Sequence, residues 1–184
     1  MKVRILFLIY FLSITCFLNA ADKPVIQIHT DNSSLIFRVA DNGRLYQSYL
    51  GKKLNHETDI SHLPQGTEAY ITHGMEDYFE PAIHILHNDG NPSLLLKYVS
   101  HETKAVAQGV NETIITLGDD KYPVTVKLHY VTYPVEDIIK TYTEISHKEK
   151  KPVVLHQYAS SMLHLNRAKY YLTEFSGDWA HEAN

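Results

Sequence analysis

The feature that most constrains the fold is a regular alternation of apolar and polar residues over residues 122–133. The apolar members occupy every second position: Tyr122, Val124, Val126, Leu128 and Tyr130. Because successive side chains of a strand point to opposite faces of its sheet, this period of two predicts a strand with one buried face. Residues 35–39 and 94–98 repeat the pattern, and turns rich in Asn, Asp and Gly bound each run.

The rest of the pattern favours strands as well. No stretch carries an apolar stripe with the 3.6-residue period of a helix, so we predict an all-β fold, an antiparallel β-sandwich. Residues 51–66 lack alternation and are predicted to form a loop with at most one short helical turn. Residues 137–147 and 152–165 flank the sequence Lys-Glu-Lys-Lys, and we interpret them as a β-hairpin with a solvated turn.

Residues 1–20 have the pattern of a secretory signal peptide. Lys2 and Arg4 precede an apolar run over residues 5–18, and small residues follow at Ala20 and Ala21. The run is shorter than the roughly 20 residues of a membrane-spanning helix, so we expect an exported protein, periplasmic or extracellular, without a membrane partner. Cys16 is the only cysteine, and the β-branched pair before it disfavours a lipid anchor. Residues 21–184 are thus expected to form one domain without disulfides.

The charge balance disfavours a nucleic-acid partner. The chain has 17 Lys and Arg against 21 Asp and Glu, for a formal net charge of −4. Its only basic cluster is Lys148, Lys150 and Lys151, with an acid inside it. Affinity for a phosphate backbone depends on clustered basic side chains, so no nucleic-acid binding is expected.

Familiar catalytic and metal-binding patterns are missing from the sequence. Although the chain has 12 histidines, a spacing of three puts His84 and His87 on opposite faces of a strand. His101, His129 and His147 are expected on polar faces of strands or in turns. There is no Gly-x-Ser-x-Gly elbow and no His-Glu-x-x-His pair. We therefore predict no metal, no cofactor and no catalytic residue.

Two segments do not fit simple alternation. Residues 73–82 place acidic and aromatic side chains between a glycine and a proline, and residues 170–182 hold the only tryptophan, Trp179. Aromatic faces stack on sugar rings while carboxylates accept hydrogen bonds from sugar hydroxyls, so the first segment suits a carbohydrate site. The alternative is an ordinary loop that closes the sandwich.

At these segments the sequence resembles the amino-terminal domain of glycoside hydrolase family 36, the bacterial α-galactosidases. Four motifs carry the resemblance, in the family's order. They are Gly74, Asp77, Tyr78, Pro81 and Ala82; the strand over residues 96–101; the run Val126 to Tyr130; and Gly177, Trp179 and Glu182. The sequence departs at Phe79, where the family commonly has arginine.

The resemblance implies a supersandwich followed by a catalytic (β/α)8 barrel that hydrolyses terminal α-galactosides with retention, through two aspartates of the barrel. Neither aspartate motif occurs in this sequence. The chain is therefore expected to be a fragment, inactive alone, that packs on the barrel of its own full-length chain and supports homo-oligomers. Asp77, Tyr78 and Trp179 are the implied substrate-binding residues for α-galactoside oligosaccharides.

Two other classes of function stay open at this point. A stand-alone carbohydrate-binding module would have a polar surface all round, with exposed aromatic side chains only at its sugar site. A structural or adhesion sandwich would have no affinity for sugars. An exposed apolar surface would favour the enzyme domain over the carbohydrate-binding module.

Overall fold

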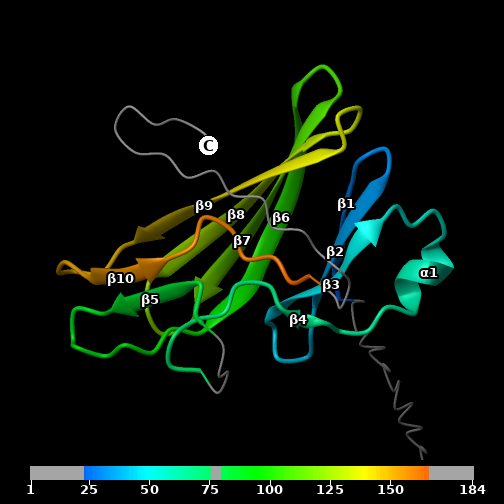
Figure 1. Cartoon of the computed structure of the whole chain (residues 1–184). Helices are drawn as coiled ribbons and strands as arrows, with labels where there is room; N and C mark the ends of the chain where they lie inside the picture. The colour runs from blue at the N-terminus through cyan, green and yellow to red at the C-terminus, as the bar shows by residue number, and fades with distance from the viewer. Residues whose placement is uncertain (1–22, 76–79, 166–184) are drawn as a thin grey trace, which may run out of the picture.

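The computed structural model describes residues 23–75 and 80–165. It contains two four-stranded antiparallel sheets, one two-stranded sheet and one short helix (Figure 1). The first sheet has the order β1 (Val25–His29), β2 (Ser33–Val39), β3 (Leu45–Lys52) and β4 (Thr67–Glu68). The second has the order β6 (Leu96–Ala107), β7 (Val110–Asp119), β8 (Val124–Tyr133) and β9 (Ile138–His147). β5 (Ile83–Leu86) pairs with β10 (Val154–Tyr158). The predicted antiparallel β-sandwich is confirmed.

The alternating residues form the core between the two larger sheets. On β8, Val124, Val126 and Leu128 are almost fully buried, as the period of two predicts. Phe37 of β2 and Tyr130 of β8 join the sheets, with their ring centroids 5.1 Å apart at a tilt of 46°. This tilted contact is a favoured aromatic geometry.

The predicted hairpin of residues 137–147 and 152–165 is wrong. β9 pairs with β8, while β10 crosses to β5, where Val154 lies opposite Leu86 and Leu155 opposite Ile85. Alternation specifies which face of a strand is buried but not which strand lies beside it. The turn between β9 and β10 is not wholly solvated either, because only 1% of the Glu149 side chain is exposed.

The loop predicted over residues 51–66 contains the expected short helical turn, α1 (Glu57–Ser61). It ends at Gly66, whose φ of +83° lies in the left-handed region. A Cβ at Gly66 would lie 1.9 Å from the carbonyl oxygen of Gln47, so this close approach requires glycine. Within residues 23–75 and 80–165, no helix is long and apolar enough to cross a membrane.

Candidate functional site

Two backbone hydrogen bonds join the ends of the candidate sugar-binding segment, and one of them reaches strand β5. His73 N–H donates to the carbonyl of Ile83 at 3.0 Å, and Ala82 N–H donates to the carbonyl of Ile71 at 2.8 Å. The first and last residues of the segment, His73 and Ala82, therefore lie close together. Asp77 and Tyr78, which the sequence predicts to bind substrate, lie outside the described residues, and so does Trp179.

Strand β10 clamps the Pro-Ala end of this segment. Gln157 Nε2 donates to Glu80 Oε1 and to the carbonyl of Pro81, both at 2.9 Å. Ala159 N–H donates to the carbonyl of Ala82 at 2.7 Å. The Pro81 and Ala82 of the motif thus fix the loop to a strand more than 70 residues away in sequence, which gives this part of the motif a positioning role.

Three imidazoles stack in a row beside the same segment. The ring centroids of His73 and His84 are 3.7 Å apart, and those of His84 and His156 are 4.8 Å apart. Burial lowers the pKa of His84, and charge on His73 and His156 lowers it further. Sequence reasoning missed this row, because the bulged pairing of β10 with β5 that assembles it has no local signal.

The stacked arrangement does not form a metal site. Rings that face one another present their nitrogens side by side, whereas metal ligands converge on one point. Among the described residues, no group of three or more His, Cys, Asp or Glu side chains is placed to hold a metal ion.

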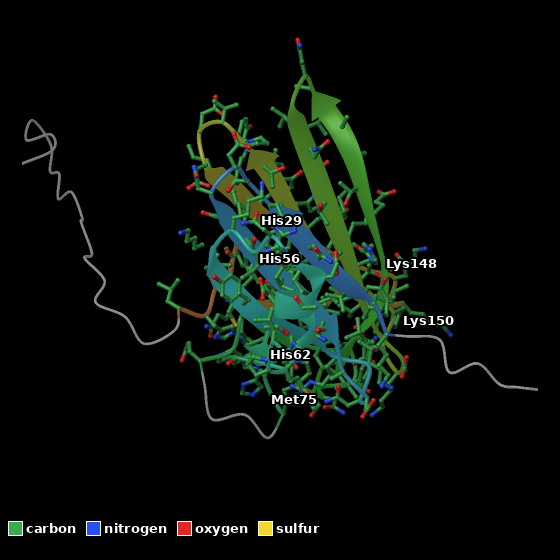
Figure 2. All side chains as sticks on the ribbon, turned by 90° about the vertical axis from the view of Figure 1, so that its right-hand side faces the viewer. His29, His56, His62, Met75, Lys148 and Lys150 are labelled. Atoms are coloured by element: carbon green, nitrogen blue, oxygen red, sulfur yellow. The ribbon has the colours of Figure 1, made fainter. Side chains whose placement is uncertain are left out.

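A small pocket of about 180 Å³ opens next to the start of the loop. It is lined by Met75, Ser93, Leu94, Leu95 and residues 119–122. Its volume equals that of about six water molecules, which is the size range of a single sugar ring. Met75 lies at the end of the molecule opposite the β6–β7 turn (Figure 2).

The two acidic side chains of this pocket, Asp119 and Asp120, already have partners within the protein. Both carboxylate oxygens of Asp119 accept backbone N–H groups, from Leu95, Lys121 and Tyr122. Asp120 pairs with Lys97 at 2.5 Å. Tyr122 is the aromatic side chain in the described lining of the pocket; it is only 8% exposed, and Lys121 Nζ lies 5.1 Å from its ring centroid.

One face of the Tyr122 ring packs on His87, which in turn contacts the buried Glu149 carboxylate. Its ring stacks on the imidazole of His87, with centroids 3.6 Å apart and a tilt of 7°. His87 Nδ1 lies 2.7 Å from Glu149 Oε1, and Tyr122 O–H donates to Asp89 at 2.9 Å. These contacts fix the aromatic wall of the pocket.

A second polar cluster crosses β6, β7, β8 and β9. Glu112 accepts hydrogen bonds from the Tyr142 hydroxyl at 2.6 Å and His129 Nδ1 at 2.9 Å, and Lys104 Nζ is 3.1 Å away. The hydrogen bonds from Tyr142 and His129 lower the pKa of Glu112 to about 2, although burial opposes them. His129 was expected on a polar face; it is only 7% exposed, because neighbouring side chains cover it.

A larger cavity of about 550 Å³ lies between β1, β2 and α1. It is lined by Lys23, Arg38, Glu57 and Ile60, among others. Arg38 donates to the carbonyl of Ile60, and Lys23 pairs with Asp41. Its lining has no aromatic side chain, so it offers no stacking surface for a sugar.

Comparison with solved structures places this fold among those of known enzymes. The α-galactosidase of Lactobacillus brevis matches with a TM-score of 0.72 and 21% identity, over 88% of this chain and 26% of that one. The α-galactosidase AgaA of Geobacillus stearothermophilus matches with a TM-score of 0.66 and 18% identity, over 74% and 24%. This chain therefore spans about a quarter of these solved chains. No match was found among curated protein sequences.

By its fold, the chain is an antiparallel β-sandwich of the class that forms part of these α-galactosidase structures. Residues 28–184 match the glycosyl hydrolase family 36 N-terminal domain. The chain belongs to this family, and the resemblance seen in its four motifs is confirmed.

Proposed function

We propose that this chain is the amino-terminal domain of an exported α-galactosidase that cleaves terminal α-galactosides with retention. The single observation that carries the proposal is the match of residues 28–184 to the family 36 N-terminal domain. The two aspartates of the mechanism would lie in a (β/α)8 barrel outside residues 1–184. The sandwich would support that barrel and the assembly of subunits, without breaking bonds itself.

Exposed apolar side chains support a packing role for the end of the described chain. Five of them fall within residues 154–165 and are between 42% and 63% exposed: Val154, Leu155, Tyr158, Leu163 and Leu165. Apolar side chains gathered in this way mark surfaces that contact another protein part. This distribution favours an enzyme domain over the stand-alone carbohydrate-binding module, which would have a polar surface outside its sugar site.

The proposed substrates are α-galactoside oligosaccharides of the raffinose type. Structures of Geobacillus stearothermophilus AgaA variants are complexes with raffinose and stachyose. Asp77 would accept hydrogen bonds from sugar hydroxyls, and Tyr78 and Trp179 would offer aromatic faces. The hydrogen bonds from Gln157 to Glu80 and Pro81 support this role, because they hold the end of the motif that follows Asp77 and Tyr78 in sequence.

The test of the sugar-binding role is Asp77→Ala in the protein encoded by the complete reading frame. We expect a higher KM for raffinose, because a hydrogen-bond acceptor for the substrate is lost. Asp59→Ala, which removes an exposed carboxylate of α1, is the matched control and should leave the kinetics unchanged. Unchanged kinetics for Asp77→Ala would remove the proposed role of the loop.

Export is tested separately. Cell fractionation and sequencing of the protein's amino terminus should place it outside the cytoplasm with Ala21 as its first residue. A cytoplasmic product that retains residues 1–20 would contradict export without affecting the family assignment.

A further inference from the structure

Strand β6 is a long free edge of the second sheet. Among the described strands its only hydrogen-bonded neighbour is β7, and residues 99–107 are all exposed. The β6–β7 hairpin projects beyond the neighbouring strands at its turn (Figures 1 and 2). An edge strand offers a row of unpaired N–H and C=O groups, to which a further strand can add.

Two bulges limit where such a strand can pair. The register of β6 against β7 shifts between Tyr98 and Ser100 and again between Ala105 and Ala107. Bulges bend a strand and interrupt its ladder. The regular part of the edge is therefore residues 100–105, so the added strand must match this short stretch.

The sequence of this stretch is complementary to itself. In an antiparallel pair of two β6 strands centred on Thr103, Glu102 of each copy lies opposite Lys104 of the other. Centring the pair on Glu102 would put glutamate opposite glutamate, and centring it on Lys104 would put lysine opposite lysine. Opposite charges stabilise cross-strand pairs and like charges destabilise them, so one register is selected.

Glu102 and Lys104 are both exposed enough to form this ion pair between two copies. Glu102 is exposed and faces Ile114 across the β6–β7 ladder, which leaves its carboxylate without a cross-strand cation. Lys104 contacts Glu112 at 3.1 Å, yet 51% of its side chain is exposed. A lysine ammonium has three donors and can serve two carboxylates.

We propose that two copies of this chain associate through β6, antiparallel about a two-fold axis at Thr103, to form one continuous sheet. Such an isologous contact closes after two copies. Met75, at the start of the candidate sugar-binding loop, lies at the end of the molecule opposite the β6–β7 turn (Figure 2). The interface does not depend on the proposed α-galactosidase activity, so either can fail without the other.

Disulfide trapping tests the register. In a Cys16→Ser background the chain has no other cysteine. Thr103→Cys puts the two introduced thiols directly opposite each other, at a distance that a disulfide spans. The matched control is His101→Cys on the same strand, because its two copies would lie about 13 Å apart. We expect a covalent dimer for Thr103→Cys and none for His101→Cys under mild oxidation. Equal crosslinking of both, or of neither, would overturn the proposal.

Charge reversal provides a second readout that does not depend on cysteine. Glu102→Lys breaks no cross-strand ion pair within one copy but creates two lysine–lysine contacts across the axis. We expect sedimentation equilibrium to show a dimer weakened by about tenfold or more, with strong dependence on salt. Unchanged association of Glu102→Lys, with folding verified by circular dichroism, would overturn the proposal.

Discussion

The imidazole of His87 and the carboxylate of Glu149 form a buried ion pair across 62 residues of sequence. At most 1% of either side chain is exposed. His87 Nδ1 faces Glu149, and His87 Nε2 lies 3.1 Å from the carbonyl oxygen of Ser93. Both ring nitrogens therefore lie within hydrogen-bond distance of acceptor oxygens. Burial raises the pKa of Glu149, but hydrogen bonds from His87 and Asn88 lower it more, so the carboxylate stays charged.

Removing one partner of this pair should destabilise the fold strongly. We expect Glu149→Gln to lower the free energy of unfolding by about 3 kcal/mol, because a buried carboxylate that accepts hydrogen bonds from His87 and from the backbone and side chain of Asn88 is lost. Lys150→Gln, an exposed change one residue away, should cost less than about 0.5 kcal/mol. Urea unfolding measures both, and equal effects would show that the ion pair contributes nothing specific.

The Glu112 cluster makes stability depend on acid pH. The pKa of Glu112 is about 2 in the folded protein and 4.5 without these contacts. The stability that Glu112 contributes is therefore fully present above pH 4.5 and is lost as the pH falls toward 2. Glu112→Gln should therefore be less stable than the unaltered protein at pH 6, and the difference should shrink below pH 4.5. A difference that does not change with pH would contradict this assignment.

His84, the middle ring of the three stacked histidines, should titrate below the ordinary histidine range. The pKa of His84 lies below the ordinary value of 6.5, first because of burial and then because of His73 and His156. The unfolded chain then binds more protons, so stability should fall as the pH drops below 6.5. NMR titration should show the lowered pKa directly. His156→Gln should move the pKa of His84 upward; no movement would show that the two rings do not interact.

Two glycines with the same backbone conformation provide a matched pair. Gly66 and Gly90 have φ values of +83° and +84°, but only Gly66 lies against other atoms. Gly90→Ala should lower the free energy of unfolding by about 1 kcal/mol, because alanine is strained in the left-handed conformation. Gly66→Ala should cost about 3 kcal/mol or more, because its Cβ meets the Gln47 backbone. Similar midpoints of denaturation for the two variants would contradict this close packing.

The sequence predicted the parts of the fold that depend on local pattern. The alternation of Val124, Val126 and Leu128 correctly identified the buried face of β8, and the lack of alternation located α1. Strand partners could not be predicted in this way. β10 follows β9 in the chain yet pairs with β5, because pairing over such distances depends on the whole core rather than on a turn.

The candidate site was predicted only in outline. The motif at residues 74–82 ends at Pro81 and Ala82, which β10 and Ala159 hold by hydrogen bonds, while the roles of Asp77, Tyr78 and Trp179 stay predictions. The row formed by His73, His84 and His156 comes from three separate segments, and Glu149 pairs with His87, which is 62 residues away in sequence. The composition gives the number of histidines but does not show which of their rings are in contact.

In the function proposed above, the sandwich belongs to an α-galactosidase but does not carry out its chemistry. The most direct measurement is hydrolysis of a chromogenic α-galactoside by two purified proteins, one comprising residues 21–184 and one encoded by the complete reading frame. We expect turnover with retention of configuration by the longer protein and none by residues 21–184. Turnover by residues 21–184, or a complete protein inactive on every α-galactoside, would contradict it.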